Sequence, residues 1–208
     1  MKTPAFKELK RAYGFDEVAI VPGDVTINPE LARTELTLGS YSFPMPVLAA
    51  AMDAVVDLSF AINYSRLGGL AVLNLEGLWT RYQNPAEILD RIVKASPGEV
   101  TTLLQKFYSE PVKEKLIGER VEAIKKGGGI CAVSVIPQNT KRFSSIALEA
   151  GLDILVVQST VTTARHKSKS YKGLVFSDLC ESVKKPVIVG NCVSYNVAIE
   201  LMEAGVSG

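Results

Sequence analysis

Residues 44–79 read PMPVLAAAMDAVVDLSFAINYSRLGGLAVLNLEGLW, and this stretch decides the fold. Val47–Ala51 is a continuous apolar run that is too short for a helix, so it predicts a strand buried on both faces. A helix is expected from about Asp57 to the glycine pair at 68–69. Leu70–Leu73 predicts a second buried strand. Two strands joined by a helix predict a parallel pair with a right-handed crossover.

The same rhythm of strand and helix continues later in the chain. Short apolar runs predict strands at 130–135, 154–157 and 187–189, and each is followed by an amphipathic helical pattern. Asn139 and Ser194 are expected to cap the helices that follow the first and the third of these strands. With the two earlier strands this makes five strands, each followed by at least one helix. Such alternation is typical of a parallel sheet covered by helices, in an open sheet or in a barrel.

Composition excludes several classes of protein. Net charge is +1 over 208 residues and no basic cluster is present, which argues against a nucleic-acid partner. No apolar run approaches the ~18 residues of a membrane span, and the first residues lack the apolar core of a secretory signal. Three cysteines without metal-like spacing favour a reducing cytoplasm as the location.

Several short motifs in the expected order resemble the IMP dehydrogenase/GMP reductase family. The motifs are Phe15–Pro22 (FDEVAIVP), Ala50–Asp53 (AAMD), Arg66–Ala71 (RLGGLA) and Leu73–Gly77 (LNLEG). One departure is Ala50, where the family has a serine that commonly contacts the nucleotide. The resemblance implies a (β/α)8 TIM barrel, and five strands cannot close an eight-stranded barrel. We therefore expect an incomplete barrel of about five βα units.

The resemblance also predicts the domain organisation. Most IMP dehydrogenases carry a regulatory pair of CBS modules after the second strand. Here only a short helical insert, at about 76–129, stands in that place. The chain is thus similar to the branch of the family without CBS modules. We expect residues 1–208 to form the N-terminal portion of one barrel domain.

Polar side chains follow the predicted strands, where a barrel of this type places its functional groups. These strand ends are Met52–Asp53, Asn74, Ser134–Gln138, Gln158–Thr160 and Gly190–Cys192. Amides and hydroxyls dominate, with one acid and no histidine. Such groups suit a neutral, hydrogen-bonding ligand such as a purine, a ribose or a nicotinamide amide. Judged by the residues alone, ordinary loop caps are the alternative.

The resemblance assigns roles to some of these residues. It implies substrate binding by Met52, Asp53, Gly190 and Asn191, and binding of a dissociable NAD or NADP by Gln158, Ser159, Thr160 and Asn191. Gln158 stands where the family commonly has an aspartate. A carboxylate that bonds a ribose diol makes charge-assisted hydrogen bonds that an amide cannot make.

No catalytic residue and no metal ligand is assigned within this chain. The family's catalytic cysteine attacks C2 of the purine and lies in a loop after the sixth strand, so we expect it beyond Gly208. The phosphate-binding loops and the monovalent cation site implied by the family are expected there too. The cysteines present, Cys131, Cys180 and Cys192, are predicted to be packed and inert. His166, the single histidine, is predicted to lie at the surface.

The implied function is NAD-linked oxidation of IMP to XMP. A GMP reductase, which converts GMP and NADPH to IMP and ammonia, is the alternative. A second alternative is a non-catalytic half-barrel that binds a nucleotide or a partner chain. The expected ligand is a purine nucleotide (IMP, GMP or XMP), and the family is typically tetrameric. An unrelated open α/β sheet that binds a nucleotide ranks last, because this chain has no glycine fingerprint after its first strand.

Overall fold

A computed structural model describes residues 11–164 and 173–208 of the protein. The chain divides into two units, residues 1–33 and residues 34–208. In the first unit, Phe15–Glu17 and Pro29–Leu31 form short 3-10 turns. The prediction of a single barrel domain over 1–208 stays a prediction.

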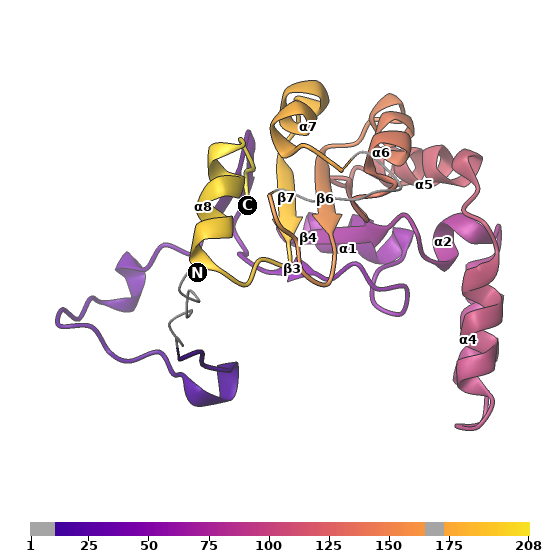
Figure 1. The fold of residues 1–208 in the computed structure, drawn as a ribbon, viewed down its shortest axis with the longest axis horizontal. Coiled ribbons are helices and arrows are strands. Elements are labelled where there is room, and N and C mark those ends of the chain that lie inside the picture. Colours follow the sequence, from indigo (N-terminus) through magenta and orange to yellow (C-terminus); the bar gives the residue numbers. More distant parts are fainter. Residues whose placement is uncertain (1–10, 165–172) are drawn as a thin grey trace, which may run out of the picture. The chain divides into compact units, whose positions relative to one another are not determined.

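The second unit is built on a five-stranded parallel sheet in the order β3-β4-β5-β6-β7 (Figure 1). Its strands are β3 (Leu48–Ala49), β4 (Leu70–Asn74), β5 (Ala132–Val135), β6 (Ile154–Gln158) and β7 (Val187–Gly190). The helices that follow them are α1 (Leu58–Arg66), α5 (Glu114–Lys126), α6 (Thr140–Glu149), α7 (Phe176–Val183) and α8 (Tyr195–Glu203). Strand order therefore equals chain order, which confirms the α/β prediction of an incomplete TIM barrel.

In β4 and β5, alternate residues are buried on opposite faces of this sheet. In β4, Ala71 and Leu73 pack on the helical side, and Leu70 and Val72 pack on the other side. This period of two explains why the predicted strands are continuous apolar runs, because neither face is left to solvent.

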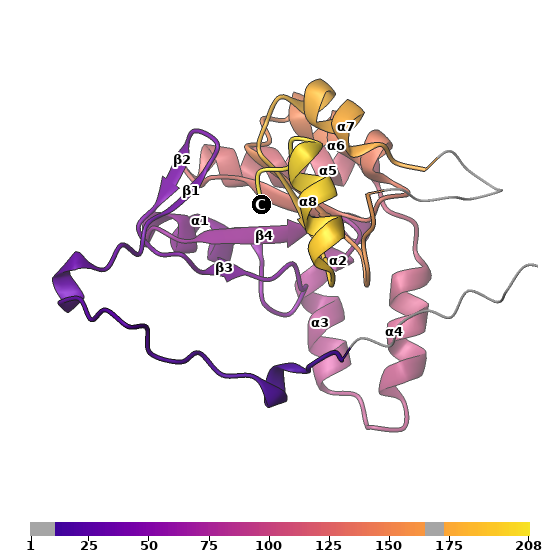
Figure 2. The same ribbon diagram turned by 60° about the vertical axis from the view of Figure 1, so that its left-hand side comes forward.

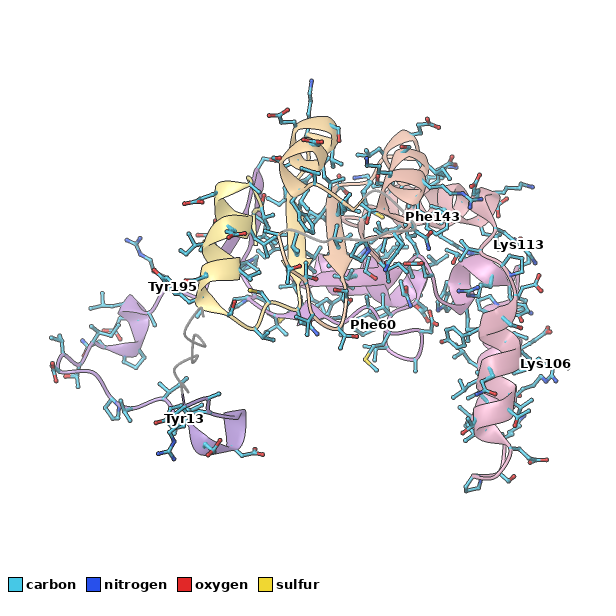
Figure 3. All side chains as sticks on the ribbon, in the orientation of Figure 1. Tyr13, Phe60, Lys106, Lys113, Phe143 and Tyr195 are labelled. Carbon is cyan, nitrogen blue, oxygen red and sulfur yellow. The ribbon has the colours of Figure 1, made fainter. Side chains whose placement is uncertain are left out.

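The helical side holds the larger core. Helices α5, α6 and α7 lie side by side along one flank of the sheet (Figure 1). Phe143, labelled in Figure 3, comes from α6 and is 4% exposed. It packs with Ile117 and Val121 of α5 and with sheet residues such as Val133. Burial of large apolar side chains supplies most of the free energy that holds helices to a sheet.

An antiparallel ribbon covers the other face of the sheet near its N-terminal end. It consists of β1 (Leu36–Leu38) and β2 (Tyr41–Phe43). Leu38 and Phe43 from the ribbon pack against Leu70, Ala132 and Ile154, all of which are 5% exposed or less. The ribbon therefore closes the end of the half-barrel that is opposite to the strand C-termini.

Three helices precede α5 in the stretch that stands in place of CBS modules. They are α2 (Leu78–Arg81), α3 (Pro85–Val93) and α4 (Val100–Ser109). Figure 2 shows α3 and α4 as a pair beyond the C-terminal end of β4. The predicted insert at 76–129 also contained α5, but α5 is a barrel helix whose Leu116, Ile117 and Ile124 are buried.

Two local predictions were wrong. β3 is an edge strand of two residues rather than a strand buried on both faces, and Leu48 is 38% exposed. Among the described residues β3 pairs with β4 alone and lies at the edge of the sheet, where fewer neighbouring side chains cover it. Asn139 occupies the N-cap position of α6 but makes no capping hydrogen bond. Its side-chain amide instead donates to Glu76 at 2.6 Å.

Within residues 11–164 and 173–208, none of the helices combines the length and the apolar character that crossing a bilayer requires.

Candidate functional site

A hollow of about 540 Å³ lies at the C-terminal ends of the strands. It is lined by Ala51, Asn74, Glu76, Tyr108, Ser134, Val135, Ile136, Gln158, Ser159, Thr160 and Asn191. Every strand from β3 to β7 contributes through its last residue or the loop that follows. The chemistry is that of the predicted strand ends, with amides and hydroxyls in the majority.

The loops after β6 and β7 are joined by backbone hydrogen bonds beneath this hollow. Ser159 N–H donates to the Gly190 carbonyl at 2.8 Å, and Asn191 N–H donates to the Ser159 carbonyl at 2.9 Å. Thr162 N–H donates to the Asn191 carbonyl at 2.8 Å. These bonds hold the polar groups of two loops in one rigid arrangement, as an effective binding site requires.

The hydroxyl of Ser159 has a defined direction because Thr162 has only one proton to give. Thr162 Oγ1 donates to the Gly190 carbonyl at 2.7 Å and lies 2.8 Å from Ser159 Oγ. Ser159 must then be the donor to Thr162. Its oxygen keeps acceptor capacity for a ligand N–H or O–H group.

Three neighbouring side chains are free to bind. Gln158, Thr160 and Asn191 are exposed and line the hollow. In residues 11–164 and 173–208 their side-chain amides and hydroxyl make no hydrogen bond with the protein. The cofactor residues predicted from sequence are therefore brought together here, at the ends of β6 and β7, as groups that can donate and accept.

Glu76 is a lining residue that the sequence reasoning missed. Its carboxylate accepts hydrogen bonds from Ile136 N–H and from the Asn139 side chain, both at 2.6 Å. Asn74 Oδ1 in turn accepts from Glu76 N–H at 3.0 Å. Glu76 therefore holds the loop after β5 to the end of β4. Its position two residues past the end of β4 is visible in the sequence, but its contact with the loop after β5 is not.

The predicted substrate residues do not all reach the hollow. Asn191 lines it, whereas Met52, Asp53 and Gly190 are absent from the lining. Met52 is 56% exposed, and a Cβ added at Gly190 would meet nothing within 4 Å. Substrate contact by these three residues stays a prediction.

Asp53 is buried under the loop that follows β3. It is 8% exposed, and its Oδ2 accepts from Leu78 N–H at 2.9 Å and from the hydroxyl of Tyr108. Its Oδ1 is buried and accepts no hydrogen bond from the described residues. A Cβ on Gly77 would lie 1.9 Å from that oxygen, so the close approach requires glycine at 77. The carboxylate joins the end of β3 to α2 and α4.

Tyr108 brings the helical pair α3–α4 into the site. It lines the hollow from the last turn of α4, although no strand ends near it in sequence. Burial first, and then the hydrogen bond to Asp53, raises the pKa of Tyr108 above its usual value. The phenol therefore stays protonated and remains a donor to the carboxylate.

The cysteines lie away from the hollow. Cys131 is buried, and burial together with the charge of Asp153 raises the pKa of its thiol to about 12. Burial also raises the pKa of Cys180. Cys192 is exposed rather than packed, because it lies in the loop after β7, and its thiol donates to the Ser194 carbonyl at 3.4 Å. His166 lies outside the described residues.

A second hollow of about 230 Å³ adjoins the first and shares Ser159 and Thr160 with it. Its remaining lining includes Gln138, Leu174 and Phe176. Ser159 and Thr160 thus present polar groups to both hollows, and Leu174 and Phe176 give the second hollow an apolar side. Such a surface can hold a ligand of several rings through hydrogen bonds and stacking.

The fold and the lining of the hollow define a class: an α/β half-barrel with a polar candidate site at the C-terminal ends of its strands. The sequence model of one protein family, the IMP dehydrogenase/GMP reductase domain, matches residues 12–208 of this chain. The chain belongs to this family of oxidoreductases.

Similar proteins agree with that membership. An uncharacterised oxidoreductase of Mycolicibacterium smegmatis is 33% identical over 204 residues, which are 96% of this chain and 54% of the relative. An inosine-5′-monophosphate dehydrogenase of Methanocaldococcus jannaschii is 37% identical over 67 residues, 32% of this chain and 14% of the relative. The crystal structure of an IMP dehydrogenase/GMP reductase-like protein from Corynebacterium glutamicum superposes with a TM-score of 0.86 at 29% identity, covering 96% of this chain and 54% of that one. The chain thus spans about half the length of the Mycolicibacterium smegmatis relative and of the Corynebacterium glutamicum structure.

Proposed function

We propose that the protein is a purine-nucleotide oxidoreductase that oxidises IMP to XMP with NAD. One observation carries the proposal: Gln158, Thr160 and Asn191 present free amide and hydroxyl groups to one hollow at the strand ends. Purines, riboses and carboxamides are recognised through such donors and acceptors.

The donor set fits a nicotinamide cofactor in part. Bound NAD would supply the hydride-accepting chemistry. Ser159 would accept a hydrogen bond from a ribose hydroxyl or an amide, because its own proton is directed to Thr162. Gln158 and Asn191 would orient the ligand through their amides. The neutral Gln158 offers weaker bonds to a ribose diol than a carboxylate does.

That amide keeps GMP reductase as the second candidate. The family commonly has an aspartate at this place, and the change alters the charge beside the cofactor by one unit. Replacing Gln158 with aspartate is therefore informative. If NAD is the cofactor, Gln158→Asp should tighten NAD binding several-fold, because a charged acceptor strengthens the bond to the ribose.

Turnover decides between the candidates. The purified protein, at its natural full length, is incubated with IMP and NAD, or with GMP and NADPH, and the reduced nicotinamide is followed by its absorbance. We expect reduction of NAD with IMP, and an Asn191→Ala variant should lower kcat/KM at least tenfold, an effect on the order of 1.4 kcal/mol. The control is Asn196→Ala, an exposed asparagine on α8 that does not line the hollow.

Each other outcome has a meaning. Consumption of NADPH with GMP alone would replace the dehydrogenase by the reductase. Binding of a purine nucleotide without turnover of either pair would favour the non-catalytic half-barrel. Absence of binding and of turnover would contradict the proposal altogether.

A further inference from the structure

We propose that Tyr108 is a substrate-binding residue whose aromatic ring stacks against the purine ring of the nucleotide. This inference rests on the proposed function and adds a contact to it. It assigns the helical pair α3–α4 a part in recognition, because that pair is what carries Tyr108 to the hollow.

Tyr108 offers a ligand its ring rather than its hydroxyl. The hydroxyl is already bound to the buried carboxylate of Asp53. The side chain as a whole is still 38% exposed and lines the hollow. The part left for a ligand is therefore the apolar surface of the ring.

This ring is held in place. The guanidinium of Arg81 lies 5.9 Å from the ring centroid, and Arg81 Nε donates to the Glu76 carbonyl at 3.1 Å. These contacts fix the end of α4 relative to the strands. A fixed ring loses little freedom when a ligand stacks on it.

The chemistry of the remaining lining supports the same contact. Tyr108 is the single aromatic residue among the residues that line the hollow, and the others are polar or small apolar side chains. Amides and hydroxyls can read the edge of a flat heterocycle, but its faces need an apolar or aromatic partner. Tyr108 supplies that partner.

The bond to Asp53 assigns the stacked ring to the purine rather than to the nicotinamide. Tyr108 donates to Asp53, which the family resemblance predicts to bind the substrate. The predicted cofactor residues Gln158–Thr160 follow β6, and two strands, β4 and β5, separate β6 from β3 in the sheet. The ring on Tyr108 is therefore expected to be that of the nucleotide substrate.

Calorimetric titration of the purified protein with IMP and, separately, with NAD tests the inference. We expect Tyr108→Ala to weaken IMP binding about tenfold, the usual cost of removing a base–aromatic stack, and to leave NAD binding within twofold. Tyr108→Phe keeps the ring and should stay within about threefold of the wild type for IMP. That difference between Ala and Phe would not arise from the lost Asp53 bond, because both variants lose it.

Tyr82→Ala is the matched control. It removes a tyrosine that packs on the same helix but does not line the hollow. We expect a lower Tm with unchanged IMP affinity. Emission of Trp79, the single tryptophan, reports on the Asp53 loop, since its indole N–H points to the Asp53 carbonyl at 3.5 Å.

Three results would overturn the inference. They are wild-type-like IMP binding by Tyr108→Ala, a larger effect of that variant on NAD than on IMP, and an equal loss of IMP affinity in Tyr82→Ala. The proposed function fails separately, if the wild-type protein binds no purine nucleotide at all.

Discussion

Two buried aspartates lie at opposite ends of the same sheet, and their carboxylates differ in how fully they are hydrogen-bonded. Asp153 stands before β6, is 6% exposed and accepts from the Tyr41 hydroxyl at 2.9 Å, from Cys131 N–H at 2.8 Å and from Lys125 at 2.6 Å. Asp53 follows β3, is 8% exposed and keeps one buried oxygen that accepts nothing from the described residues.

The difference separates stability from function. At the N-terminal end the ribbon residue Tyr41 and the helix residue Lys125 saturate the carboxylate, so this end is built to hold the fold together. At the C-terminal end the carboxylate positions Tyr108 beside a hollow where, among the described residues, the side chains of Gln158, Thr160 and Asn191 are free. Barrels of this kind divide the two tasks in the same way between their two ends.

The largest effect is expected at the N-terminal end. Asp153→Ala leaves the buried Cys131 N–H without its partner and frees Lys125 and Tyr41, so it should lower the free energy of unfolding by about 2–4 kcal/mol. Urea unfolding measures the loss. Asp24→Ala, at an exposed position, should change it by less than about 0.5 kcal/mol. If the two variants lowered the free energy of unfolding equally, Asp153 would not stabilise the N-terminal end of the sheet as described.

Gly77→Ala tests the other end directly. The new Cβ would lie 1.9 Å from Asp53 Oδ1, so the carboxylate must move. We expect the free energy of unfolding to fall by about 1–3 kcal/mol and the emission of Trp79 to change. Gly118→Ala is the control, because a Cβ there meets nothing within 4 Å and the site lies inside α5. The free energy of unfolding of that variant should rise by up to about 1 kcal/mol. An unchanged free energy of unfolding in Gly77→Ala would show that Asp53 is not held as described.

Glu76→Gln sharpens the contrast within the site. The carboxylate accepts from two donors, and an amide offers only one acceptor atom, so one bond is lost. We expect a loss of about 1–2 kcal/mol in stability by urea unfolding and weaker IMP binding by calorimetry. Glu119→Gln, which breaks a solvent-exposed pair with Lys115, should cost about 0.5 kcal/mol or less. An unchanged affinity for IMP in Glu76→Gln would limit Glu76 to a structural role.

The smallest effect is a pH dependence that belongs to Tyr41. Burial and the hydrogen bond to Asp153 raise the pKa of Tyr41 from 10.0 to about 12. The folded state then holds this proton more tightly than the unfolded state does. Its stabilising contribution is complete below pH 10 and is lost as the pH rises toward 12.

Unfolding at a series of alkaline pH values measures that contribution. Because Tyr41 is only partly buried, we expect the loss to be on the order of 1 kcal/mol. Tyr41→Phe should remove this part of the pH dependence, whereas exposed Tyr195, replaced by phenylalanine, should not. Identical slopes for Tyr41→Phe and the wild type would contradict the assignment.

Much of the architecture follows from the residues alone. The apolar runs at 70–73, 154–157 and 187–189 were predicted as strands and are strands. Each is apolar on both faces, and local composition is enough to show this. Helix ends were predicted as well, since Gly68, with a φ of +88°, and Ser194, whose side chain accepts from Val197 N–H, act through their nearest neighbours.

The site was predicted in part for the same reason. Strand ends can be read from the chain, so Asn74, Ser134, Gln158 and Asn191 were expected at one edge and line one hollow. Glu76 lies two residues beyond a strand end, where the loop after β4 turns back to meet Ile136. A turn of this kind depends on the partner loop, which the local pattern does not contain.

The sequence by itself determined the parallel α/β plan and the family, because both rest on local patterns of apolar residues and short motifs. Only the tertiary structure decided which polar groups are already engaged. Asp53 was the single acid among the strand ends, yet its carboxylate is committed to Leu78 and Tyr108, residues 25 and 55 positions away in the chain. Contacts at such separations form only when the sheet and the helical pair pack together, and no local pattern of residues encodes them.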